Sequence, residues 1–85
     1  MSDKLEIKKK KLLYRASYRG TKEMDILLSS FVNRYINEFD EHLINELEKF
    51  LNFEDETIQN YFQHKIAKQQ IDENEVAKIF KNFKI

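Results

Sequence analysis

The chain contains no proline and a single glycine, Gly20, and this restricts its fold more than any other feature of the sequence. Proline breaks helices and glycine weakens them, so a chain almost free of both can stay helical over long stretches. Leucine, lysine and glutamate are abundant, and they favour helices joined by short polar connections. The sequence predicts an all-α fold, a small single-domain bundle of about five short helices.

A long amphipathic segment follows the glycine and runs to Phe39. Gly20 can adopt positive φ and close a preceding helix, and Thr21 can cap the next one through its hydroxyl. We therefore expect a helix-turn-helix corner and a central helix contacted by several others. Apolar residues at spacings of three and four form the buried face of this helix: Met24, Leu27, Leu28, Phe31, Val32, Tyr35, Ile36 and Phe39.

The first helix is expected at about residues 5–19, as part of a single helical domain over residues 1–85. Residues 1–10 are the part expected to fray, because Lys8–Lys11 offers no apolar anchor. This lysine run could attract phosphate or an anionic membrane, but a solvated helix face is the favoured interpretation. Charged residues balance to a formal +0, which argues against a globally basic nucleic-acid surface.

Three aspartates mark the expected starts of the remaining helices. Asp40 is expected to cap a third helix and Asp55 a short fourth helix. Asp72 and Glu75 have the spacing of a capping box at the start of the last helix. Tyr61, on the fourth helix, is expected in the core or at its edge, because aromatic side chains bury large apolar areas.

Signatures of catalysis and metal binding are weak in this sequence. The chain has no cysteine and no glycine-rich phosphate loop, so thiol nucleophiles and P-loops are excluded. His42 and His64 fall on separate expected helices, and surface or capping roles are favoured for both. We predict no catalytic residue, no metal site and no tightly bound cofactor.

The sequence also bears on the compartment. No apolar run approaches the roughly 20 residues needed to cross a bilayer. The amino terminus lacks the apolar core of a secretory signal and carries early acids that an import presequence avoids. A bacterial cytoplasmic protein is therefore favoured over a mitochondrial precursor, and a processed matrix protein stays open as an alternative. We also expect the free protein to be monomeric.

Polar residues at the corner allow two interpretations. Glu23, Ile26 and Ser30 follow helical spacing on a flank away from the apolar face, and Arg19 extends the same stripe. In one interpretation Gly20 ends a helix and the charges complement the helix dipoles. In the other, the stripe is a surface for a partner.

The run from Leu12 to Leu28, followed by Phe31, resembles the signature of the succinate dehydrogenase flavinylation-factor (SdhE) family. The family's Arg-Gly-x-x-Glu motif falls on Arg19, Gly20 and Glu23. The resemblance continues through Phe50-Leu51 and Glu54-Asp55 to Tyr61. Four positions depart from the family pattern without touching this motif: Tyr18, Thr21, Glu56 and Tyr61.

This resemblance implies an assembly chaperone rather than an enzyme. The partner would be the immature flavoprotein subunit of succinate dehydrogenase, or of a related fumarate reductase, and the factor would promote covalent attachment of FAD to a histidine of that client. Arg19 would donate to client carboxylates or carbonyls, Glu23 would accept hydrogen bonds, and Gly20 would allow close backbone approach. The remaining partner-binding candidates are Asp25, which would orient the corner, and the rim residues Tyr14 and Arg15.

Two other functions are alternatives to a flavinylation factor. One is a small helical interaction or regulatory module whose partner is not a flavoprotein. The other, less favoured, is nucleic-acid binding through the corner and Lys8–Lys11.

Overall fold

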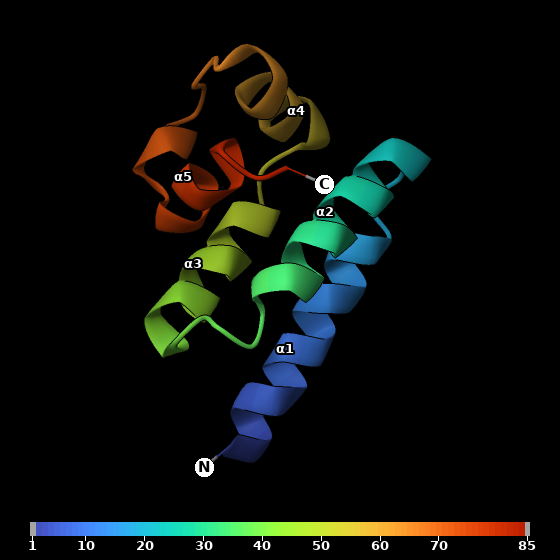
Figure 1. Ribbon diagram of the computed structural model, residues 1–85, viewed down its shortest axis with the longest axis vertical. Coiled ribbons are helices and arrows are strands. Elements are labelled where there is room, and N and C mark those ends of the chain that lie inside the picture. Colours follow the sequence, from blue (N-terminus) through green and yellow to red (C-terminus); the bar gives the residue numbers. More distant parts are fainter. Residues whose placement is uncertain (1, 85) are drawn as a thin grey trace.

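The computed structural model describes residues 2–84, and these form five α-helices and one 3₁₀ turn, without a β-strand (Figure 1). The all-α prediction is confirmed. None of the helices in this part of the chain has the length and apolar content needed to cross a bilayer. The helices are α1 (Ser2–Ser17), α2 (Lys22–Tyr35), α3 (Glu41–Leu51), α4 (Asp55–His64) and α5 (Glu75–Lys81), with the 3₁₀ turn η1 at Ile71–Glu73.

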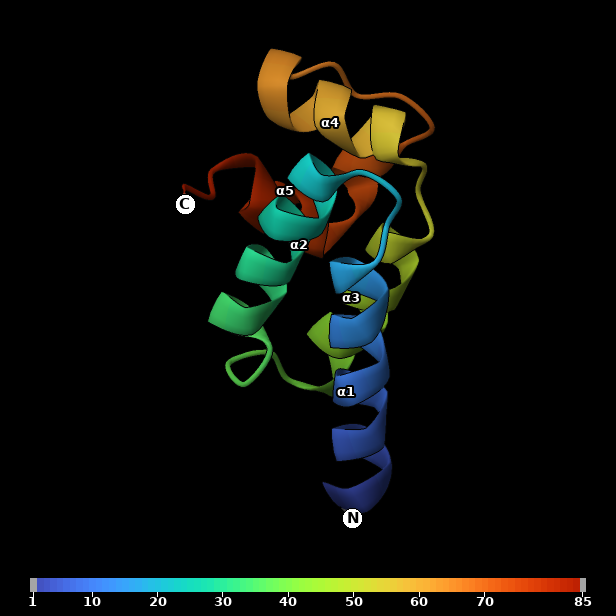
Figure 2. The ribbon, with the colours of Figure 1, turned by 90° about the vertical axis from the view of Figure 1, so that its right-hand side faces the viewer.

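The fold consists of a helical hairpin, on which the other helices build in succession. α1 and α2 form the hairpin, α3 packs against α1, and α5 packs against α3. α4 lies at the end of the molecule that holds the α1–α2 corner, and the first turns of α1 extend towards the opposite end (Figures 1 and 2). The corner is thus placed close to the beginning of α4.

The core is apolar and centres on Phe31 of α2. Its ring lies edge-on to Phe80 of α5, with centroids 5.0 Å apart, and 6.3 Å from Phe50 of α3. All three side chains are fully buried, and each buried aromatic contributes about 1.5–3 kcal/mol through removal of apolar area from water. The prediction that α2 presents its apolar face to several helices is confirmed.

Two of the predicted helix caps are confirmed. The Thr21 hydroxyl accepts a hydrogen bond from the Met24 N–H at 3.3 Å, and the Asp40 carboxylate accepts one from the Leu43 N–H at 2.9 Å. α2 ends at Tyr35, before the predicted end at Phe39. The cap at Asp40 requires extended backbone, so the preceding residues must leave the helix to turn into α3.

The other two predicted caps are wrong. Glu54, not Asp55, occupies the N-cap of α4 and makes no side-chain cap bond. Asp72 lies in the 3₁₀ turn, and Asn74 caps α5 by accepting from the Ala77 N–H at 2.8 Å. The Asn74 amide also donates to the Glu46 carbonyl on α3, a tertiary bond that favours Asn74 over Asp72 as the cap.

Candidate functional site

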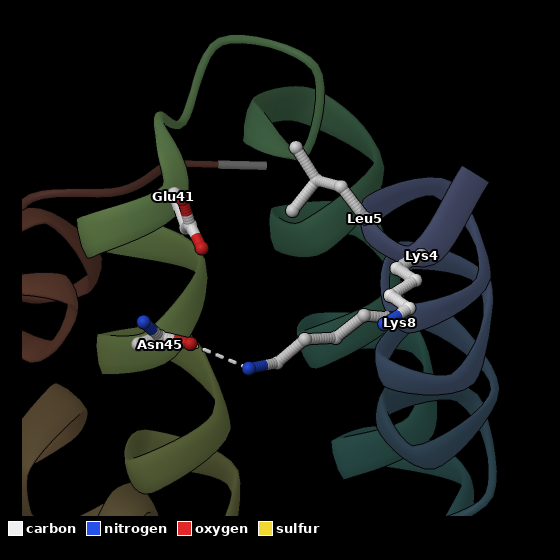
Figure 3. Close-up of a pocket in the computed structure, with 5 residues that line it drawn as sticks. All are labelled: Lys4, Leu5, Lys8, Glu41 and Asn45. Atoms are coloured by element: carbon white, nitrogen blue, oxygen red, sulfur yellow. Dashed lines mark hydrogen bonds between the residues drawn. The ribbon is translucent and has the colours of Figure 1, made fainter. Parts of the chain in front are cut away.

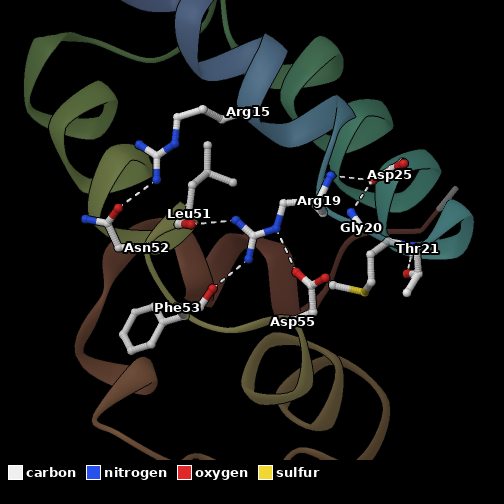
Figure 4. A network of polar contacts seen from close by, with 10 residues as sticks. Arg15, Arg19, Gly20, Thr21, Asp25, Leu51, Asn52, Phe53 and Asp55 are labelled. Atoms are coloured by element: carbon white, nitrogen blue, oxygen red, sulfur yellow. Dashed lines mark hydrogen bonds and ion pairs between the residues drawn. The ribbon is translucent and has the colours of Figure 1, made fainter.

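The corner between α1 and α2 is closed by a carboxylate from the first turn of α2. Asp25 Oδ1 accepts hydrogen bonds from the backbone N–H groups of Arg19, at 2.5 Å, and Gly20, at 3.3 Å (Figure 4). Gly20 has φ +135°, a conformation that residues with a Cβ rarely adopt. An added Cβ would meet only Asp55 Oδ2, at 4.0 Å, so backbone conformation rather than crowding calls for glycine here.

Arg19 points from the corner into the connection between α3 and α4. Its Nε donates to Asp55 Oδ1 at 2.7 Å, and its two Nη groups donate to the carbonyls of Leu51, at 2.5 Å, and Phe53, at 2.6 Å (Figure 4). Leu51 is the last residue of α3, so the guanidinium satisfies carbonyls that the helix end leaves without partners. The planar fork of arginine suits three such acceptors at once.

The expectation that Arg19 is exposed in the free protein is therefore wrong. Its side chain is 11% exposed, and its guanidinium is engaged by acceptors within the chain. The reason is the position of α4, which brings Asp55 to the corner. Sequence reasoning assigned Asp55 only a capping role and so missed it as the partner of Arg19. The part of Arg19 in partner binding stays a prediction.

Of the other candidate residues at the corner, Glu23 and Tyr14 face solvent and Arg15 is half-buried. Glu23 is exposed and takes part in no ion pair within residues 2–84. Tyr14 is 65% exposed, and its ring lies 4.5 Å, centroid to centroid, from the ring of Tyr18. Arg15 donates to the Asn52 side chain at 2.6 Å. The corner thus combines an internal polar network with an outward-facing set of polar and aromatic groups.

The structure gives the histidines surface positions. His42 and His64 are both exposed, and His42 Nε2 lies 2.5 Å from Glu75 Oε2. Within residues 2–84, no group of three or more metal-ligating side chains comes together.

A hollow of about 300 Å³ lies between the first turns of α1 and the start of α3 (Figure 3). Lys8 crosses it to donate to Asn45 on α3 and also pairs with Glu48 at 3.1 Å. Leu5 forms part of its wall (Figure 3). Lys4 and Leu5 belong to the first turns of α1, so the hollow lies at the end of this helix remote from the corner. The ammonium group of Lys8 is thus already paired with side chains of α3.

Two side chains among residues 2–84, Glu46 and Tyr61, have pKa values shifted from their ordinary ones, and both lie outside the corner. A hydrogen bond from the Glu75 backbone N–H lowers the pKa of the Glu46 carboxyl, which burial opposes and Lys49 reinforces. Burial raises the pKa of the Tyr61 hydroxyl, with a further contribution from the charge of Asp72. The first shift concerns the contact of α3 with α5, and the second the packing of α4 beside η1.

Comparisons with known proteins agree with the motif at the corner. Residues 10–84 match the family model described as flavinator of succinate dehydrogenase. The mitochondrial succinate dehydrogenase assembly factor 2 of Scheffersomyces stipitis is 43% identical over 47 residues, which cover 55% of this chain and 32% of the relative. Assembly factor 2-A of Drosophila mojavensis, also mitochondrial, is 40% identical over 48 residues, covering 56% and 31%. The matched stretches thus span about a third of the length of these relatives, and no solved structure gives a match.

Proposed function

Because the chain belongs to the family of succinate dehydrogenase flavinators, we propose that it binds the immature flavoprotein subunit of succinate dehydrogenase, or of a related fumarate reductase, and promotes covalent attachment of FAD. The observation that carries this proposal is the family match over residues 10–84, a range that contains the whole corner. The role is that of an assembly factor.

In this proposal the client supplies both reacting groups, a histidine imidazole and the methyl carbon of its bound flavin. The factor supplies geometry. By binding the client conformation in which these two groups approach, it reduces the orientational part of the barrier. A rigid surface serves this purpose better than a mobile one, because less ordering entropy is lost on binding.

The corner has the rigidity that such a surface needs. Arg19 and Asp25 would act as positioning residues, because their hydrogen bonds join the corner to α2, α3 and α4. Glu23 and Gly20, which are exposed, would contact the client directly. Tyr14 and Arg15 would lie at the rim of the contact.

Substitution of Glu23 tests the proposal. We expect Glu23→Ala to slow covalent flavin incorporation into the purified apo-subunit about tenfold or more, as loss of a hydrogen bond to a charged group predicts. The rate is measured from flavin fluorescence that stays with the denatured subunit. Glu41→Ala is the matched control, because Glu41 is also an exposed acid in the first turn of a helix, and its rate should stay within about twofold of wild type.

An unchanged rate for Glu23→Ala, with wild-type helicity, would refute the role of that carboxylate. Capture of the tagged protein's partners from its source cells provides the wider test. If no subunit with covalent flavin is recovered, while another protein is, the chain is an interaction module for a different client.

The compartment of action follows the client. The relatives described above are named mitochondrial, so they support a mitochondrial location over the bacterial cytoplasm that the amino-terminal sequence favoured. Cell fractionation that locates the protein together with the flavoprotein subunit would decide between the two compartments.

A further inference from the structure

Two exposed apolar side chains on the outer side of α1, Ile7 and Tyr14, and a third directly after its end, Tyr18, form a row that we call the α1 ridge. Their exposed fractions are 54%, 65% and 69%. A separation of seven residues places Ile7 and Tyr14 on one side of the helix, opposite the buried Leu12 and Ala16. The ring of Tyr18 continues the row through its contact with the ring of Tyr14. Three of the five large apolar side chains that are exposed in the described part of the chain thus lie in this row.

Lysines flank the α1 ridge on both sides. Lys4, Lys10 and Lys11 are exposed and form no ion pair with residues 4–84, whereas Lys8 and Lys9 pair with glutamates. α1 carries six basic and two acidic residues, a formal +4, in a chain whose net charge is +0. The outer side of α1 is therefore a local positive surface with an apolar row along its middle.

We propose that the α1 ridge docks onto an apolar strip bordered by carboxylates on the immature flavoprotein subunit. This inference rests on the proposed function and extends the contact from the corner along α1, since Tyr18 directly precedes Arg19. The centroids of the two tyrosine rings lie 4.5 Å apart, and aromatic side chains of this kind anchor interfaces at low entropic cost. Unpaired lysines beside it steer an acidic partner and set its orientation.

The same features disfavour other occupants. A second copy of the chain would bring two rows of lysines together, which costs free energy through repulsion between like charges. Helices that lie in a membrane surface have a broad apolar face, whereas the α1 ridge is one side chain wide. An acidic protein surface matches both the charge and the width of the α1 ridge.

Charge and polarity reversals on the α1 ridge provide the test. We expect Ile7→Asp and the double variant Lys10→Glu/Lys11→Glu each to weaken binding of the purified apo-subunit about tenfold or more at low salt, with the loss shrinking as salt rises. The matched controls are Ile66→Asp, at an apolar residue 44% exposed after α4, and Lys68→Glu/Lys84→Glu. Their dissociation constants should stay within about twofold of wild type. Circular dichroism checks that every variant is folded.

The outcomes separate this inference from the proposed function. Ridge variants with wild-type affinity and wild-type flavin incorporation would overturn the α1 ridge and leave the proposed function standing. A wild-type protein that does not bind the apo-subunit would overturn both. Wild-type affinity combined with loss of sedimentation on phosphatidylglycerol vesicles, or with loss of a dimer in ultracentrifugation, would assign the ridge to a membrane or to a second copy and overturn the proposal.

Discussion

The side chain of Arg19 donates to three acceptors, at the end of α3, in the α3–α4 connection and at the start of α4, and only a guanidinium can reach all of them. A lysine keeps the charge but offers a point donor in place of a planar fork. We therefore expect Arg19→Lys to lower the free energy of unfolding by about 2–3 kcal/mol, because half-buried carbonyls lose their partners. Urea unfolding followed by circular dichroism measures this change.

Arg34→Lys is the control for that measurement. Arg34 pairs with Glu38 on the surface, with 58% of its side chain exposed, so its replacement should cost no more than about 0.5 kcal/mol. Equal losses for the two variants would show that the network around Arg19 adds nothing beyond an ordinary surface pair.

At this scale the sequence could indicate which residues matter but not what they contact. The motif singled out Arg19 and Gly20, and the positive φ of Gly20 is as predicted. The carbonyl partners of Arg19 could not be foreseen, because every residue has a carbonyl and only the tertiary structure selects those of Leu51 and Phe53. Asp55, an acid at the start of α4, was the one usable signal.

Among the helices, α5 depends on a cap that also acts as a tertiary anchor. The Asn74 side chain accepts from Ala77 and donates to the Glu46 carbonyl, and the residue is 7% exposed. We expect Asn74→Ala to cost about 2–3 kcal/mol, the sum of a lost cap and an orphaned carbonyl. Asp72→Ala should cost less than about 0.5 kcal/mol. Denaturant unfolding of both variants would contradict this assignment if Asp72→Ala were the more damaging change.

The positions of the elements were largely predictable, because apolar spacing of three and four residues records a helix's buried face. Caps were predictable where no tertiary partner competes, as at Thr21 and Asp40. They were not predictable where the side chain binds a group distant in the sequence instead, as Asp55 accepts a hydrogen bond from Arg19. Local preference alone cannot rank these two uses of a carboxylate.

For the molecule as a whole, the buried Tyr61 links stability to alkaline pH. Burial raises the pKa of its hydroxyl above the ordinary 10.0, so the folded state holds this proton more tightly than the unfolded chain does. The corresponding stability is complete below pH 10 and is lost as the pH rises through the higher, folded-state pKa. We expect the free energy of unfolding to fall less steeply above pH 10 in Tyr61→Phe than in wild type.

Tyr14→Phe provides the comparison, since Tyr14 is 65% exposed. Its alkaline slope should match that of wild type in urea titrations at successive pH values. If Tyr61→Phe shows that slope too, burial of the Tyr61 hydroxyl is not what couples stability to pH.

The hydrogen bonds of the Arg19 side chain reach residues that come 32, 34 and 36 positions later in the chain. During translation, the hairpin of α1 and α2 therefore leaves the ribosome well before the groups that lock its corner have been made. A nascent chain that stops short of Asp55 has the motif but lacks the ion pair between Arg19 and Asp55. The surface proposed to receive the flavoprotein thus reaches its final form only after the first turn of α4 has been made.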